Sequence, residues 1–204
     1  MAEAARKLAT YEDLLALPED VRAEVIGGQI VVTPSPLPEH GWIQLSVGRT
    51  IGGPFDVGGF GGGRTGPGGW WILAEVDVRL SPHDIVRPDV AGWRRQRLPD
   101  PWGKRPIDVV PDWVCEILSP ATARYDRGPK MRLYVEHGVG HCWLIDPTLR
   151  TLEAYAAEPD AEGRRRWVRL GCWAEDDEVR LPPFEAEPLR VGLLFPPRSG
   201  ASQG

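Results

Sequence analysis

The sequence predicts a mixed α/β (α+β) fold in which helices flank a central sheet, with a β-hairpin near the N-terminus. Two largely apolar runs, 112–118 and 142–146, are typical of strands that are covered on both faces. A Gly-Gly pair separates two β-branched runs within 23–33, which is a strong hairpin signal. Apolar residues recur near every fourth position over 38–51, as they do along one face of a helix.

The size and composition of the chain fit one domain. Its 204 residues, of which 42% are hydrophobic, are enough to bury one sizeable core. We expect this domain to span 10–195, with a flexible N-terminus over 1–9 and a disordered tail over 196–204.

The remaining elements follow in chain order. A short helix is expected after Thr10, which can cap it while Asp13 reaches back to the backbone. The glycine-rich stretch 52–69 lacks the Gly-Lys-Ser/Thr ending of a phosphate-binding loop, so we expect a flexible loop there. We further expect a half-exposed strand over 73–80, strands over 86–93 and 112–118, a helix over 126–137, a strand over 142–146 that pairs with 151–155, and short edge strands over 167–170 and 178–181.

Each of two neighbouring apolar strands is interrupted by one acidic residue. Glu116 lies in the run 112–118, and Asp89 lies in the run 86–93. A carboxylate in such surroundings destabilises the fold unless a positive charge or hydrogen-bond donors compensate it. The pair favours a shared divalent cation, while the alternative is that each acid merely pairs with an arginine or caps a turn.

Metal-dependent phosphodiester hydrolysis also needs a group that orients water or stabilises developing charge. Lysine suits this role because its ammonium can lie beside a water and a developing phosphorane. The residue two places after Glu116 is Leu118, so the amine must come from elsewhere. Lys130 lies early in the next expected helix, and a helix packed against the sheet can direct it back toward Glu116.

Composition narrows the classes of function. The formal net charge of −5 argues against binding of polyanions by the whole surface, although it leaves room for a local basic groove. The 3 cysteines lie far apart, and Cys115 and Cys142 lie in apolar runs typical of strands, so we expect buried thiols rather than disulfides or zinc ligands, which fits the cytoplasm. The N-terminus shows no secretory signal and no apolar run approaches ~20 residues, so we expect no membrane association.

The acids and the lysine occur within a series of motifs that resembles the Uma2 family of restriction-endonuclease-like proteins. The resemblance is carried by Tyr11-Glu12-Asp13-Leu14, Ala23-Glu24-Val25-Ile26-Gly27-Gly28, Pro34-Ser35-Pro36 with His40, Arg87-Pro88-Asp89-Val90, Pro111 to Pro120, Asp126 with Lys130 and Tyr134, Gly138-Val139 and Trp143-Leu144-Ile145-Asp146-Pro147. The Glu-Ile-Leu-Ser-Pro, Lys and Trp-Leu-Ile-Asp-Pro series is specific in this order, although each piece alone is not. The resemblance covers roughly 10–195.

The resemblance implies a PD-(D/E)xK nuclease fold whose lysine has moved from the second acidic strand to the following helix. Carried over, Asp89 and Glu116 are the metal acids, Lys130 is the catalytic lysine, and Glu24 is an additional catalytic and metal-binding acid. The implied activity is hydrolysis of DNA with Mg²⁺ or Mn²⁺. Gln29 departs from the family, which usually has an acid there, and glutamine cannot neutralise a cation.

Seven further residues are weaker candidates. Glu75 and Asp77 would share one face of the strand over 73–80, and Glu75 is the better metal ligand of the two, although exposed strand acids are usually only solvated. His40 could contact a phosphate or organise the site, but a lone helical histidine is more often structural. Arg124, Arg127, Lys104 and Arg105 could contact a DNA backbone.

Two other classes of function stay open beside the endonuclease. One is a catalytically silent nuclease fold used for binding or regulation, which the acidic net charge favours mildly. The other is a transposon-associated or repair factor that needs a separate DNA-recognition chain. If the protein cuts both strands with one site per chain, a homodimer is expected.

Overall fold

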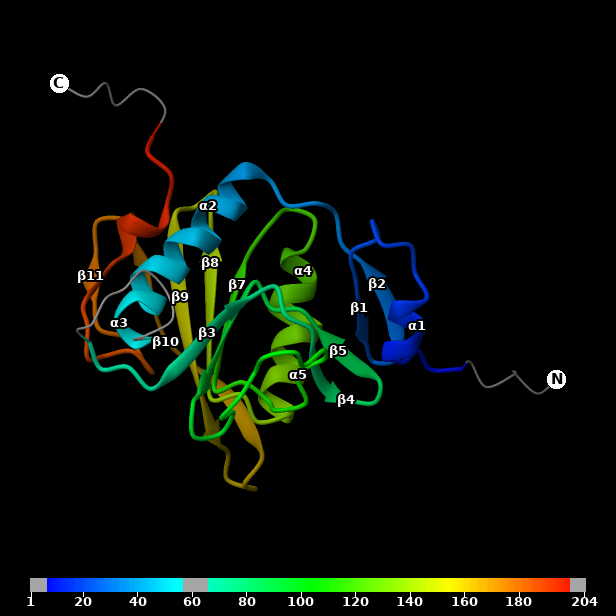
Figure 1. Cartoon of the computed structure of the whole chain (residues 1–204). Coiled ribbons are helices and arrows are strands. Elements are labelled where there is room, and N and C mark those ends of the chain that lie inside the picture. Colours follow the sequence, from blue (N-terminus) through cyan, green and yellow to red (C-terminus); the bar gives the residue numbers. More distant parts are fainter. Residues whose placement is uncertain (1–6, 57–65, 199–204) are drawn as a thin grey trace.

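The structure is a computed structural model that describes residues 7–56 and 66–198, and it consists of two main β-sheets with flanking helices (Figure 1). The larger sheet has six strands in the order β10-β9-β8-β7-β6-β3, and the smaller has four in the order β2-β1-β5-β4. Only β7 and β8 pair in parallel within the larger sheet, so it is mixed, as predicted. The larger sheet contains β3 (Trp70–Ala74), β6 (Val90–Arg94), β7 (Trp113–Ile117), β8 (His141–Asp146), β9 (Thr151–Pro159) and β10 (Arg165–Ala174). The smaller sheet contains β1 (Ala23–Ile26), β2 (Gln29–Val32), β4 (Val78–Ser81) and β5 (Asp84–Val86).

The helices are short, and two of them continue through π-helical turns. The α-helices are α1 (Tyr11–Leu15), α2 (Pro38–Val47), α3 (Gly53–Phe55), α4 (Ala123–Tyr125) and α5 (Met131–Glu136), and the π-helical segments are η1 (Gly48–Gly52) and η2 (Asp126–Lys130). The chain ends with a two-stranded sheet of β11 (Glu178–Val179) and β12 (Leu189–Arg190), followed by the 3₁₀ helix η3 (Val191–Leu194). Within residues 7–56 and 66–198, none of the helices is both long and apolar enough to cross a bilayer.

Strand β7 lies between β6 and β8 in the larger sheet, and every residue of it is buried. Successive side chains of a strand point to opposite faces of the sheet. Trp113, Cys115 and Ile117 therefore enter the core formed with α2, while Val114 enters the core formed with α5. The prediction of a strand covered on both faces is confirmed, and the alternation directs Glu116 to the α5 side.

The hairpin at the N-terminus forms as predicted. Gly27 and Gly28 have φ values of 58° and 70°, the left-handed conformation that a tight primed turn requires and that glycine adopts without a Cβ clash. The pairing runs from Ala23 opposite Val32 to Ile26 opposite Gln29. This hairpin carries Glu24 into the interior, where it is buried.

The expected strand over 73–80 is wrong, because β3 and β4 are separate strands in different sheets. Glu75 lies between them with φ 56°, a left-handed conformation that ends the alternation of faces. Asp77 is buried against Arg87 and Arg105, so its solvent-exposed reading is also wrong. The two ion pairs supply the compensation that a buried carboxylate needs.

The expected strand over 86–93 divides in the same way. β5 ends at Val86 in the smaller sheet, and β6 begins at Val90 in the larger one. Asp89 lies in the short connection between them, not within a strand. The acid is therefore placed where the chain passes from one sheet to the other.

The helix expected over 38–51 runs further than predicted. α2 continues through η1 and α3 to Phe55, so the start of the glycine-rich stretch is helical rather than loop. Residues 57–65 of that stretch lie outside the described residues, as do 1–6 and 199–204, on which the expected flexible ends mostly rest. The domain limits stay predictions.

The helix expected over 126–137 begins earlier, at Ala123, and passes through η2 before α5. Pro129 consequently lies inside the helix and not in its first turn. Gly138, with φ 96°, follows the helix end as predicted.

The cap of α1, the strands β9 and β10 and the cysteines largely follow the predictions. Thr10 N–H donates to Asp13 Oδ2 at 2.9 Å, which is the expected capping contact. β9 pairs antiparallel with β8 as expected, but β10 is a ten-residue strand and not a short one. All three cysteines are free thiols, of which Cys172 is exposed.

Replacing Leu144, which is 1% exposed in the α5-side core, by alanine should lower the free energy of unfolding by about 2–5 kcal/mol. The same change at Leu149, which is 69% exposed, is the matched control and should alter it by less than about 0.5 kcal/mol. Urea unfolding of the two variants measures both values. Equal losses would contradict the assignment of this core.

Candidate active site

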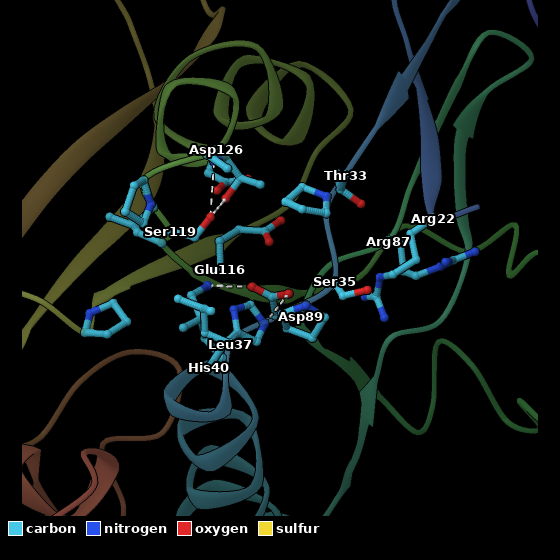
Figure 2. A pocket seen from close by; sticks show the side chains of 18 of the residues that line it. Arg22, Thr33, Ser35, Leu37, His40, Arg87, Asp89, Glu116, Ser119 and Asp126 are labelled. Carbon is cyan, nitrogen blue, oxygen red and sulfur yellow. Dashed lines mark hydrogen bonds and ion pairs between the residues drawn. The ribbon is translucent and has the colours of Figure 1, made fainter. Parts of the chain in front are cut away.

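The predicted acids line a cavity of about 600 Å³ where β1, β7, α2 and η2 meet (Figure 2). Glu24 comes from the smaller sheet and Glu116 from the larger, while Asp89 lies in the connection between the sheets. Lys130, at the end of η2, lines the same cavity. Residues that are far apart in the sequence are thus gathered at one place.

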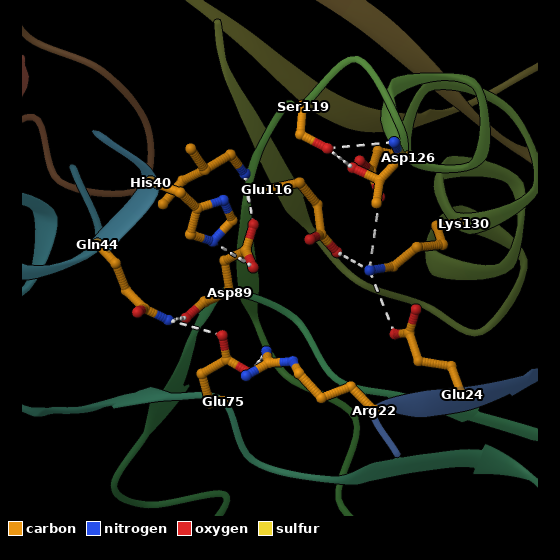
Figure 3. A network of polar contacts seen from close by, with 12 residues as sticks. Arg22, Glu24, His40, Gln44, Glu75, Asp89, Glu116, Ser119, Asp126 and Lys130 are labelled. Carbon is orange, nitrogen blue, oxygen red and sulfur yellow. Dashed lines mark hydrogen bonds and ion pairs between the residues drawn. The ribbon is translucent and has the colours of Figure 1, made fainter. Parts of the chain in front are cut away.

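The side chain of Lys130 points toward Glu116 of β7, on the α5 side of the larger sheet (Figure 3). Its Nζ lies 2.9 Å from Oε1 of Glu116, 3.2 Å from Oε1 of Glu24 and 3.7 Å from Oδ1 of Asp126. All four residues are buried. One ammonium therefore neutralises part of a cluster of three carboxylates.

Burial and charge shift the pKa values of this cluster. Burial raises the pKa of Glu116 well above its ordinary value, and Asp89 and Asp126 add to the rise, while Lys130 opposes it. Burial also raises the pKa of Asp126. Although burial acts against the charged amine, Glu116 and Glu24 outweigh it and raise the pKa of Lys130 well above its ordinary value. The folded protein therefore keeps Lys130 as an ammonium.

Tyr134 holds Glu116 from a second side. Its buried hydroxyl donates to Oε1 of Glu116, the atom that also faces Lys130. Burial raises the pKa of Tyr134 well above its ordinary value, and Glu116 adds to this effect, so the phenol stays a neutral donor. The Glu116 carboxylate is fixed by two donors that lie one helical turn apart.

Asp89 is held by contacts to both of its carboxylate oxygens. Its Oδ2 accepts the N–H of Ile117 at 2.6 Å, and its Oδ1 lies 3.0 Å from Nε2 of His40. Gln44 donates to the backbone carbonyl of Asp89 at 2.8 Å. Burial lowers the pKa of His40, but the hydrogen bond and charge of Asp89 outweigh it, so the net shift is upward.

Glu75 lies near Asp89. It accepts a hydrogen bond from Gln44 at 3.3 Å and forms an ion pair with Arg22 at 2.5 Å. One ligand atom from each of His40, Glu75 and Asp89 lies within 4.8 Å of the others, and across the described chain this is the one such trio. Carboxylate oxygens suit Mg²⁺ and Mn²⁺, and an imidazole nitrogen shifts the preference toward Mn²⁺ and other transition metals. The residues present therefore fit a divalent cation.

The sequence-predicted residues thus form two adjoining groups. Glu24 and Glu116 surround Lys130, whereas Asp89 is grouped with His40 and Glu75. Asp89 joins the groups because it accepts the N–H that follows Glu116.

Sequence reasoning missed the roles of Asp126, Tyr134 and Gln44. Asp126 and Tyr134 each lie four residues from Lys130, and Gln44 lies four residues after His40. Residues at this spacing share a helix face, so the signal was available once Lys130 and His40 were candidates.

Other candidates are engaged elsewhere. Arg105 pairs with Asp77 at 3.1 Å, and Arg127 pairs with Glu153 at 2.6 Å. Gln29, where an acid was expected, is exposed at the start of β2 and does not line the cavity.

Replacing Lys130 by methionine should lower the free energy of unfolding by about 3–5 kcal/mol near pH 8, because it leaves buried acids without a counter-charge. The loss should be smaller near pH 5. The raised pKa values of Glu116 and Asp126 rise further without the ammonium, so the folded variant holds protons that the unfolded chain releases as pH rises.

Urea unfolding at the two pH values, with exposed Lys104→Met as the matched control, measures this effect. A pH-independent loss, or the same loss in the control, would contradict the charge cluster.

Comparisons with known proteins show the family and the fold of this chain. A family model described as "Uma2: Putative restriction endonuclease" matches residues 8–190. Among solved structures, the chain is similar to one from Anabaena variabilis described as a "putative nuclease belonging to DUF820", with 24% identity, a TM-score of 0.65, and coverage of 91% of this chain and 97% of that chain. This likeness shows a shared fold, and a search of the curated proteins found no match. Because the family match spans most of the sequence, the chain belongs to the Uma2 family.

Proposed function

We propose that this protein is a metal-dependent endonuclease that hydrolyses phosphodiester bonds in DNA. The observation that carries the proposal is the position of Lys130, whose Nζ lies 2.9 Å from Glu116 in the cavity that Asp89 also lines. An amine from the following helix can therefore supply the fixed positive charge that phosphodiester chemistry needs, which supports the proposal. The family description, which names a restriction endonuclease, supports DNA as the substrate.

The proposed metal ligands are Asp89, Glu116 and Glu24, with Glu75 and His40 as neighbours that extend the donor set. A bound Mg²⁺ or Mn²⁺ would polarise a phosphoryl oxygen and lower the pKa of a water. Of the donor sets, the trio of His40, Glu75 and Asp89 is already compact, with ligand atoms within 4.8 Å.

The chain's own groups have distinct tasks in hydrolysis. The Lys130 ammonium orients the attacking water and stabilises negative charge on the phosphoryl oxygens. Glu116 fixes the amine and Tyr134 fixes Glu116, because Lys130 and Tyr134 both contact Oε1 of Glu116. The water oxygen bonds to phosphorus, one P–O ester bond breaks, and the water's proton ends on the released hydroxyl.

The variants Asp89→Asn and Lys130→Met should each reduce plasmid cleavage by about 10²–10³-fold, because each removes a fixed charge at the reacting phosphate. The exposed residues Asp108 and Lys7 give the matched controls Asp108→Asn and Lys7→Met, which should cut like the wild type. Gel assays of negatively supercoiled plasmid, in which local strand opening is favoured, with Mg²⁺ or Mn²⁺ and with EDTA added, measure the rates. Full activity in either site variant would refute its assigned role.

Metal binding tests the donor set apart from cleavage. Asp89→Asn and His40→Gln should each weaken Mn²⁺ binding by about 10–100-fold, as the loss of a ligand or of its hydrogen-bonded neighbour does. His137 follows the end of α5 and is partly exposed, so His137→Gln is the matched control and should leave the Mn²⁺ affinity unchanged. Isothermal titration calorimetry gives the dissociation constants, and wild-type affinity in His40→Gln would remove that residue from the site.

One observation favours a second function, a catalytically silent fold used for binding or regulation. The Lys130 ammonium already contacts Glu116, Glu24 and Asp126, so much of the buried negative charge is compensated by the protein itself. A wild-type protein that gives no heat with Mg²⁺ or Mn²⁺ and cuts no DNA would favour this function.

A further inference from the structure

We propose that the cavity takes a single strand of DNA, which inserts one unpaired nucleotide, and not a continuous duplex. This inference rests on the proposed function and names its substrate class. It is carried by the depth of the reactive groups, the size of the cavity, the chemistry of its walls and the state of its cations.

The reactive groups lie well below the surface. Glu116 is 1% exposed and Lys130 is 4% exposed, while the side chain of Asp89 is 15% exposed. A scissile phosphate must therefore enter the cavity to reach them. The phosphates of an intact duplex are held in place along a stiff double helix, whereas a single strand can bend sharply and carry one phosphate into the cavity.

The volume of the cavity fits one small ligand. At about 600 Å³ it lies within the range of pockets that enclose drug-sized molecules, about 300–1,000 Å³, and a nucleotide is of that size. A duplex, whose major groove alone is about 12 Å wide, cannot be enclosed in such a space.

The walls are apolar and stiff. The segment between β2 and α2 contributes Pro34, Pro36 and Leu37, and the opposite wall contributes Pro120 and Ala121. Proline fixes its backbone φ, so these walls keep their shape. Apolar surface of this kind can cover the face of an unpaired base, which is buried by stacking in a duplex and exposed to water in a single strand.

Polar groups stand beside these walls. Thr33 and Ser35 line the cavity (Figure 2), as does Thr148, and their hydroxyl groups can serve as donors or acceptors for a base edge or a sugar. Apolar surface, hydrogen-bonding groups and the Lys130 ammonium thus line one cavity of about the size of a nucleotide.

The cations of the cavity are already engaged. Arg22 pairs with Glu75 at 2.5 Å, Arg87 with Asp77 at 2.6 Å, and Lys130 with Glu116 at 2.9 Å. Duplex-binding proteins typically neutralise several phosphates with lysine and arginine. With a formal net charge of −5, this chain is better suited to contacts with one nucleotide than to a long duplex backbone.

Binding measurements test the substrate class. Fluorescence anisotropy with labelled oligodeoxynucleotides of one sequence, in Ca²⁺ to suppress hydrolysis, should give a dissociation constant about tenfold lower for the single strand than for the duplex. Equal or tighter binding of the duplex would overturn the proposal. Tighter binding of an RNA strand of the same sequence would overturn the choice of DNA.

A variant that fills the cavity adds a second test. Ala121 is exposed at the rim, so Ala121→Trp should fold normally and weaken single-strand binding about tenfold by occupying the space. Ala161→Trp, at an exposed position in the β9–β10 connection, is the matched control and should bind like the wild type. Unchanged binding by Ala121→Trp would place the strand outside the cavity and overturn the proposal.

Hydrolysis of bis(p-nitrophenyl) phosphate with Mn²⁺ tests the proposed function apart from the proposed substrate class. If this small phosphodiester is cleaved but the duplex binds as well as the single strand, the substrate class is wrong and the proposed function stands. If the single strand is preferred but no phosphodiester is cleaved, the ligand class is supported and the proposed function is wrong.

Discussion

The packing of the two sheets around the cavity depends on the ion pairs that the Lys130 ammonium forms. It contacts Glu116 on the larger sheet and Glu24 on the smaller one. Buried ions destabilise a protein unless opposite charges and hydrogen bonds surround them closely. Glu24 also accepts the N–H of Arg87 at 2.6 Å, two residues before Asp89. The Lys130 amine therefore links β1 to β7. The segment that carries Asp89 is hydrogen-bonded to Glu24, one of the two acids that the amine contacts.

The charge of this cluster links stability to function. Lys130 supplies one positive charge, whereas Glu24, Glu116 and Asp126 supply three carboxyl groups. The raised pKa of Glu116, caused first by burial and then by neighbouring acids, means that the protein can balance the excess by retaining a proton. A cation beside Asp89 would balance it instead, and metal binding would then release protons. The features that make the acids costly to bury are thus those that favour binding of a divalent ion.

Local sequence patterns predicted the parts of this site that depend on local structure. The continuous apolar run around Glu116 predicted a strand buried on both faces, and the Gly27-Gly28 pair predicted the hairpin that carries Glu24. Leu118 stands where a lysine is expected, and Lys130 was predicted to replace it because it lies early in the helix that follows the strand. The contact of His40 with Asp89 was beyond this reasoning, since the two residues lie 49 positions apart and meet only when α2 packs on the sheet.

The errors in the strands expected over 73–80 and 86–93 have a common physical cause, which is that the chain changes sheets twice in this region. Alternating polarity over 73–80 is typical of one strand, but Glu75 takes a left-handed conformation and the chain leaves the larger sheet there. It returns between Val86 and Val90, and this second crossing is what places Asp89 at the junction. Period-two alternation reports which side of a strand is buried, but it carries no information on which sheet the strand joins.

The helix that delivers Lys130 shows how an unfavourable residue is accommodated next to the site. Pro129 has no N–H to donate and its ring would clash with a carbonyl of the preceding turn, so a regular α-helix is disfavoured there. The chain forms the wider turn of η2 over Asp126–Lys130 instead. One extra residue in a turn rotates the side chains that follow by about 100° around the axis. The widened turn therefore helps to set the direction of Lys130 and, one turn later, of Tyr134, and both reach the same oxygen of Glu116.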